Sequence, residues 1–268
     1  MVTYYQNPPV VAVGIAFAFN PLSTEQWGSC LEFLNVEYKD TFADREDVVR
    51  DNIQILSRSD EGTPTMLKGE TRITHVDFRD LKEQMLSVGR DFLAYYKFRF
   101  SQEDYPHFQI VLPKALEMLS KLREVVPDVN ITQISVTYLD DLHFPINESE
   151  PFNLSDYMLL GIAIPETASF GHVFDFNFRT SHALIGDDKG SLQIQLMRME
   201  TDKKEYRIQI YWTCQIDVPD LQGDNQELLT TKLNAAHQYC YRCFEDSLTP
   251  KAKKLFNCVS EEASKNIR

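Results

Sequence analysis

Large apolar residues recur at every second position along several segments of the chain, a pattern that is typical of strands with one buried face. The first such segment is Val10–Phe19, and the residues of its second face are small, which favours close packing under a helix. These small residues are Ala12, Gly14, Ala16 and Ala18. Ser23 and Gln26 then have the spacing of a capping box, and an apolar stripe at helical spacing follows them. The pattern therefore predicts a strand followed by a helix.

The same reading predicts the remaining elements. Strands are expected at 71–78, 85–88, 92–100, 131–139, 174–178, 192–196 and 206–218. Helices are expected from Ser101 to Val126, with Pro113 as a kink or as the true start, and at 153–160, at 226–246 and after Thr249. Residues 40–70 are charged and weakly patterned, so we predict no element there.

The order of these elements occurs twice along the chain. Each half reads as strand, helix, antiparallel strands and long helix, and the change from one half to the other lies at 126–130. We therefore predict an α+β fold of two similar halves, 1–128 and 129–268, each with an antiparallel sheet packed against a long helix. The repeated order suggests an internal duplication.

Composition and charge exclude several classes of function. The net charge of −13 repels nucleic acid and attracts a basic protein partner. No apolar run approaches the roughly 20 residues of a membrane span. The five cysteines are an odd number, and no signal-peptide pattern opens the sequence, so we expect a cytoplasmic protein. The expected partner is another protein or a second copy of this chain.

Two groups of side chains are candidate metal ligands. Asp140, Asp141 and His143 follow the end of a predicted strand, where carboxylates and an imidazole suit a divalent ion or proton transfer. The second group has the residue types of a zinc site, although most of it lies on a predicted helix and core packing is the competing interpretation. Its members are His237, Cys240, Cys243 and Cys258.

A cavity for a small ligand is a third candidate. A meander covered by a long helix can enclose apolar space, lined here by Phe174, Phe176, Trp212 and Leu233. The competing interpretation is that these side chains fill the core. The sequence has no nucleophile elbow, phosphate loop, dinucleotide fingerprint or zinc-protease motif, so no cofactor is predicted.

Several short motifs together resemble a sporadically distributed, uncharacterised family of prokaryotic proteins of about this length. They are the Asn-Pro-Pro-Val entry into the first strand (Asn7–Val10), the Tyr-Pro-His-Phe opening of the middle helix (Tyr105–Phe108), the strand segment Val136–Asp140, and the closing series Ala236-His237, Phe244 and Leu248-Thr249. Phe108 stands where the family has Trp, and Thr137 and Asp140 stand where it has Arg and Asn. The resemblance implies no activity, but members of such families often lie in defence-related gene clusters.

Three functions follow as hypotheses. The first is a non-catalytic protein-binding or regulatory module, such as an accessory, antitoxin-like or defence-system component, because catalytic motifs are missing and the chain is acidic. The second is a protein that binds a small ligand in an apolar cavity between sheet and helix. The third is a metal-dependent enzyme, although the missing motifs favour a role that is not enzymatic.

Overall fold

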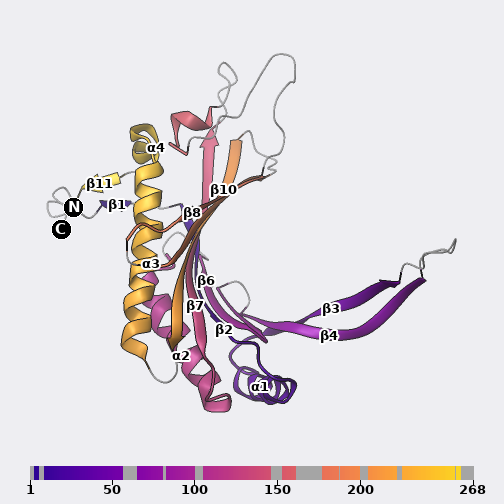
Figure 1. Ribbon diagram of the computed structural model, residues 1–268. Coiled ribbons are helices and arrows are strands. Elements are labelled where there is room, and N and C mark those ends of the chain that lie inside the picture. The colour runs from indigo at the N-terminus through magenta and orange to yellow at the C-terminus, as the bar shows by residue number, and fades with distance from the viewer. Residues whose placement is uncertain are drawn as a thin grey trace.

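The computed structural model describes residues 3–5, 9–56, 65–80, 83–99, 105–145, 153–160, 177–186, 188–199, 205–221, 225–256 and 258–260. Its centre is a single antiparallel sheet of nine strands in the order β3-β4-β5-β6-β2-β7-β10-β9-β8 (Figure 1). The strands are β2 (Val10–Phe19), β3 (Asp44–Leu56), β4 (Thr65–Asp80), β5 (Gln84–Gly89), β6 (Phe92–Phe98), β7 (Ile131–Pro145), β8 (Asn177–Ala183), β9 (Gly190–Met199) and β10 (Glu205–Leu221). A short pair, β1 (Thr3–Tyr5) and β11 (Cys258–Ser260), brings together segments near the two ends of the chain.

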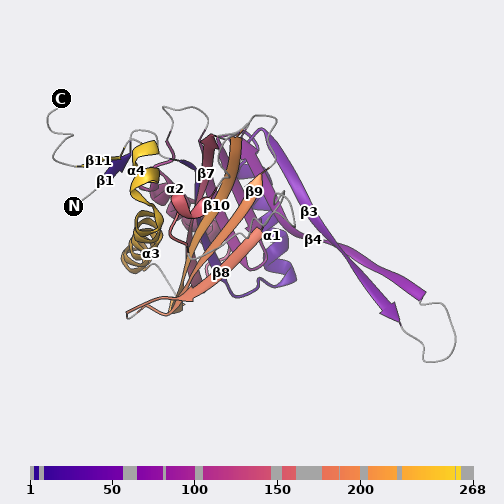
Figure 2. The ribbon, with the colours of Figure 1, turned by 90° about the horizontal axis from the view of Figure 1, so that it is seen from above.

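Helices lie on one face of this sheet (Figures 1 and 2). They are α1 (Thr24–Glu37), α2 (Phe108–Val125), α3 (Gln226–Ser247) and α4 (Pro250–Leu255), with a short 3-10 turn, η1, at Leu154–Asp156. Helix α2 packs on β2 and β6, whereas α3 packs on β7 and β10. The core lies between the helices and the sheet, and its largest fully buried side chains are Trp212, Phe17 and Phe144.

The predicted capping box at the start of α1 is confirmed. The Gln26 backbone N–H donates to Ser23 Oγ at 3.2 Å, and the Ser23 backbone N–H donates to Gln26 Oε1 at 2.9 Å. These two bonds satisfy groups that the first turn of a helix leaves unpaired, an effect of about 1 kcal/mol.

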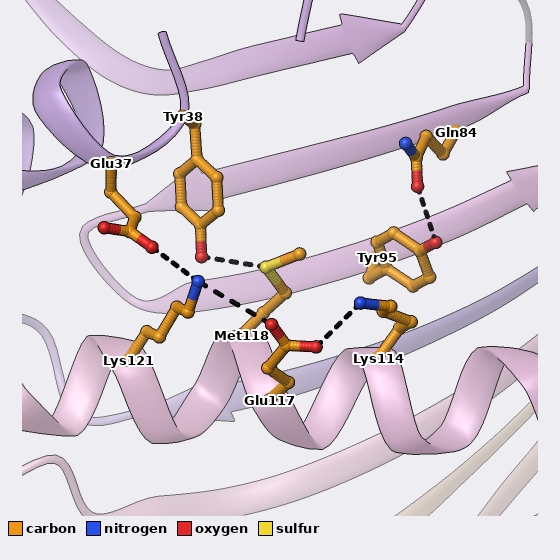
Figure 3. A network of polar contacts seen from close by, with 8 residues as sticks. All are labelled: Glu37, Tyr38, Gln84, Tyr95, Lys114, Glu117, Met118 and Lys121. Carbon is orange, nitrogen blue, oxygen red and sulfur yellow. Dashed lines mark hydrogen bonds and ion pairs between the residues drawn. The ribbon is translucent and has the colours of Figure 1, made fainter. Parts of the chain in front are cut away.

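A polar network joins α1 to α2 beside the sheet (Figure 3). Lys121 of α2 contacts Glu37 of α1 at 2.5 Å and Glu117 one turn earlier at 3.6 Å. The Tyr38 hydroxyl donates to Met118 Sδ at 2.8 Å. Because Lys114 and Lys121 both contact Glu117, they lower the pKa of that carboxyl. The network holds the end of α1 against α2.

The prediction of two halves, each with its own sheet and long helix, is wrong. Strands β2 and β7, which would open the two halves, pair with each other from Val10 opposite Asp140 to Phe19 opposite Ile131. This pairing merges all nine strands into one continuous sheet. The sequence patterns of β2 and β7 predict these two strands correctly, but they do not specify which strand lies beside which, because pairing depends on residues far apart in the chain.

The charged segment 40–70, for which no element is predicted, contains all of β3 and the start of β4. Strand β4 pairs with β5 only from His75 to Asp80, whereas its pairing with β3 continues to Thr65. Beyond His75 the two strands form a two-stranded arm that leaves the body of the molecule (Figures 1 and 2). A ribbon without further neighbours buries little apolar surface, so its sequence lacks the alternation that identifies a core strand.

Most other predicted elements are confirmed, with changed ends. Strand β10 buries the alternating apolar residues of its sequence pattern, α3 ends one residue later than predicted, and Thr249 caps α4 through the Ala252 backbone N–H. Helix α2 begins at Phe108 rather than Ser101 and continues through Pro113. Residues 153–160 form only the 3-10 turn, and no helix in the described part of the chain is long and apolar enough to cross a membrane.

Candidate functional site

The face of the sheet opposite the helices, here called the open face, carries a row of small side chains that crosses the strands. In the pairing register, Ser87 of β5 lies opposite Ala94 of β6, Ala94 opposite Ala16 of β2, and Ala16 opposite Ser135 of β7. We call these four residues the trough. Asp77 of β4 lies opposite Ser87 at one end, and Gln215 of β10 lies opposite Ser135 at the other. With neighbouring strands about 4.8 Å apart, this row of six strands spans about 24 Å.

Two glycines allow aromatic rings to lie flat beside the trough. A Cβ atom on Gly14 would come within 2.2 Å of the Tyr96 ring, and one on Gly89 within 2.3 Å of the Phe92 ring. The His75 ring lies next to that of Phe92, with their centroids 5.7 Å apart. His75 and Phe92 therefore border the trough on one side and Tyr96 borders it on the other, and we call these three residues the aromatic wall. The missing glycine side chains are the reason that the Phe92 and Tyr96 rings rest on the sheet.

A hollow of about 410 Å³ lies over the trough and is lined by the three residues of the aromatic wall. Asp77, Gln133 and Gln215 also line it, besides the trough serines. The hollow begins at the base of the arm, since His75 is the first residue of β4 that pairs with β5. Its volume is within the range of pockets that hold a small molecule or a few side chains of a partner.

Asp77 is the one carboxylate that lines the hollow, and one of its oxygens lacks a partner in the described structure. The residue is 8% exposed, and Oδ1 is buried without a hydrogen bond. The other oxygen, Oδ2, accepts from Arg79 at 3.3 Å, and Arg79 also contacts Glu46 at 3.2 Å. His75 Nε2 is 3.9 Å from Oδ1, which is too long for a hydrogen bond. A buried carboxylate oxygen without a donor is costly, so this position favours a ligand that supplies one.

Beyond the trough, the open face carries amide and hydroxyl side chains that bind one another, and the guanidinium of Arg179 also donates to Gln193. Gln193 donates to Gln215 at 3.0 Å, and Gln195 donates to Asn177 at 3.1 Å. The hydroxyls of Thr137 and Thr213 are 3.1 Å apart. We call Gln193, Gln195 and Gln215 the amide strip. It continues the trough toward β8 with groups that donate and accept hydrogen bonds without a net charge.

The predicted group Asp140, Asp141 and His143 does not come together. Consecutive residues of a strand point to opposite faces, so Asp140 lies under the helices and Asp141 on the open face. Arg207 binds both oxygens of Asp141, with its Nε and Nη2 at 2.8 and 2.7 Å, and His143 Nε2 lies 3.5 Å from the same carboxylate. Asp141 therefore forms an ion pair on the surface of the sheet, away from Asp140.

Asp140 is a buried core residue. It is 1% exposed, and Oδ2 accepts from the Trp212 indole N–H at 2.6 Å. Oδ1 has no hydrogen-bond partner among the described residues. Burial raises the pKa of this carboxyl to about 7, although the bond from Trp212 opposes the shift.

The second predicted metal group is also dispersed. The Tyr138 hydroxyl and His237 Nδ1 are 2.6 Å apart and share a hydrogen bond, and burial lowers the pKa of His237, which favours the neutral ring. Cys240 Sγ is 3.6 Å from two carbonyl oxygens of the sheet, and burial keeps its thiol protonated by raising its pKa well above the usual value. Cys243 is only partly buried, and the side chain of Cys258 lies outside what the structure describes.

Within the described ranges, no three His, Cys, Asp or Glu side chains lie close enough to hold a metal ion. Among the suggested ligands whose side chains are described, Asp140 and Cys240 are packed in the core and Asp141 forms an ion pair.

The predicted apolar ligand site lies in the core where it is described. Trp212 and Leu233 are fully buried, and the Trp212 ring contacts that of Phe244 edge to face at 6.1 Å. Phe174 and Phe176 lie outside the described residues. The hollow is on the opposite face of the sheet, so the side chains of Trp212 and Leu233 do not line it.

The trough is not predicted by the sequence. The pattern identifies the small face of Val10–Phe19 but places it under a helix, whereas this face points away from the helices. Ser87, Ala94 and Ser135 lie far from it in the chain and become its neighbours only through strand pairing. The sequence feature that could have indicated the trough is the presence of Gly14 and Gly89 in segments rich in aromatic residues.

No family model matches this chain, and no curated protein is similar to it at a significant level. The family resemblance described above therefore stays a prediction, and the function has to be argued from the site.

Proposed function

We propose that the protein is a non-catalytic binding module whose trough holds an extended segment of a partner protein. The observation that carries the proposal is the cross-strand row from Asp77 to Gln215, in which four neighbouring strands present only Ala and Ser side chains. A shallow path of about 24 Å has the length of about seven extended residues. Small side chains allow the backbone of such a segment to approach the sheet.

The surroundings of the trough support an extended polypeptide. The amide strip offers paired donors and acceptors, which suit the alternating N–H and C=O groups of a peptide backbone. The net charge of −13 favours a basic segment and speeds its association at low salt. The aromatic wall along the trough provides apolar surface of the kind that anchors protein interfaces.

The experiment is site-specific photocrosslinking in the native cell, followed by reconstitution. A benzophenone amino acid replaces Gln193 on the open face or, as the matched control, Gln238 on the exposed side of α3. We expect position 193 to crosslink to one protein that position 238 does not capture. The purified partner should then bind the native chain, and Ser135→Trp, which fills the middle of the trough, should weaken that binding at least tenfold.

Two results would overturn the proposal. One is a partner that crosslinks through position 238 alone. The other is a purified complex whose affinity is the same for the native chain and Ser135→Trp, with Gln238→Trp as the control for adding an indole elsewhere.

A small ligand is a second candidate because the hollow has a volume of about 410 Å³. Native mass spectrometry of the protein from its own cell distinguishes the two functions. An adduct with the mass of a small molecule that disappears in Ser135→Trp would favour the small ligand, whereas a protein complex of defined stoichiometry favours the partner. A complex of two identical chains would identify the partner segment as part of a second copy.

A further inference from the structure

We propose that the hollow binds the guanidinium group of an arginine side chain, held by Asp77 at the end of the trough. The inference rests on the proposed function, because it assigns the chemistry of one side chain in the partner segment. It goes beyond that function by naming the residue type that the hollow selects.

The first step of the argument is the orphaned oxygen. Asp77 lines the hollow, and its Oδ1 is buried without a hydrogen-bond donor in the described structure, whereas Oδ2 is already bound by Arg79. A carboxylate oxygen accepts only, so the missing group is a donor. A donor that carries positive charge forms the stronger bond, at a position where solvent competes little.

The second step is the aromatic wall. His75, Phe92 and Tyr96 line the same hollow as Asp77, and rings next to a carboxylate suit a flat cation. The guanidinium of arginine is planar, stacks on ring faces and is weakly hydrated, whereas the ammonium of lysine is a compact and strongly hydrated charge. The wall therefore favours arginine over lysine.

The third step is the number of acceptors. Arginine has five N–H donors, and the hydroxyl of Ser87, which lies directly opposite Asp77 in the pairing register, adds a second acceptor beside the oxygen of Asp77. The same cross-strand row continues with Ala94 and Ala16, which leaves an open path for the aliphatic part of the side chain.

The test uses small probes and does not require the partner. Nα-acetylarginine N-methylamide is titrated into the full chain and followed by NMR chemical shifts, and the citrulline analogue provides a neutral probe of nearly the same shape. We expect the arginine probe to shift signals of residues that line the hollow and to bind at least tenfold more tightly than the citrulline probe. The lysine analogue should bind more weakly than the arginine probe.

Two variants separate the local charge from the overall charge. Asp77→Asn should abolish the preference for arginine over citrulline. Asp80→Asn removes the same charge from the same strand, but Asp80 pairs with Gln84 on the other face, so the preference should remain. Thermal unfolding checks that both variants fold, and Tyr96→Leu, which removes part of the wall, provides an independent variant with an expected loss of at least threefold.

Equal affinity for the arginine and citrulline probes would overturn the inference, as would equal losses in Asp77→Asn and Asp80→Asn or a lysine probe that binds more tightly. Shifts confined to residues outside the hollow would also overturn it. Because no partner is present, these failures leave the crosslinking result unchanged, and a failed crosslinking experiment leaves the probe result unchanged.

Discussion

The two faces of the sheet each bury an aspartate with one unpartnered oxygen, and the two sites differ in what lies next to that oxygen. Asp140 is enclosed by the core, where Trp212 is its hydrogen-bond donor. Asp77 lines the hollow on the open face, where Arg79 binds its other oxygen. On the covered face no ligand can reach the unpartnered oxygen, and protonation of Asp140 removes the cost of burying its charge. On the open face the unpartnered oxygen belongs to a residue that lines the hollow, where a binding partner can supply a donor.

Whether an unpartnered buried oxygen indicates a binding site depends on the groups and the space around it. The pKa of Asp140 is about 7 because burial disfavours the charged form, and this is a property of the fold rather than a sign of catalysis. Asp77 keeps an arginine beside it and adjoins space that is large enough for a side chain. The open face is therefore the better place to search for function.

The largest expected effect is the pH dependence that Asp140 gives to stability. The folded carboxyl keeps its proton up to about pH 7, whereas in the unfolded chain it has the usual aspartate pKa of 3.8 and releases the proton earlier. Its contribution to the free energy of unfolding therefore falls as the pH rises between these values. A shift of about three pKa units corresponds to about 4 kcal/mol.

The variant Asp140→Asn removes this titration. Relative to the native chain, its free energy of unfolding should increase by about 4 kcal/mol between pH 4 and pH 9. Urea unfolding at pH 4, 6, 7 and 9 measures the difference. A difference that stays constant with pH would show that Asp140 has an ordinary pKa.

Replacing the neighbouring residue, Asp141, should lower the free energy of unfolding, whereas Asp140→Asn raises it relative to the native chain as the pH rises. Asp141→Asn breaks a two-pronged ion pair with Arg207 on the open face, and it should destabilise the chain by about 2 kcal/mol at pH 7. The measurement is urea unfolding at low and high salt. Arg207→Gln is the partner variant, and the double variant should cost little more than either single one. Stabilisation by Asp141→Asn would contradict the assignment of the two carboxylates to different faces.

Sequence reasoning identifies the strands that bury one face, because alternation in segments such as β2 and β10 reflects contact with a core. It finds the helix caps at Ser23 and Thr249, since these depend on neighbours three residues away. It does not predict the pairing of β2 with β7, which decides that the fold has one sheet. The arm escapes prediction because two strands without a core carry no apolar alternation.

The candidate site shows the same limit. Asp140, Asp141 and His143 are close in sequence, but strand geometry separates the first from the other two. The residues of the trough are instead far apart in sequence, and strand pairing brings Ser87, Ala94 and Ser135 into one row. Sequence reasoning selects side chains by chemistry, and small residues without reactive groups are not selected, although their lack of bulk creates the hollow.

The smallest expected effect compares one lost hydroxyl on each face. Tyr138→Phe removes the hydroxyl that shares a hydrogen bond with His237 Nδ1 under the helices, and it should destabilise the chain by about 1 kcal/mol. Thr213→Val removes the hydroxyl that lies 3.1 Å from that of Thr137 on the open face, where water can replace it, so the cost should be at most a few tenths of a kcal/mol. Urea unfolding at pH 7.5, where His237 is neutral because burial lowers its pKa, measures both variants. Equal costs would mean that the open face excludes water as well as the covered face does, and a face already closed to water has no room for a partner segment.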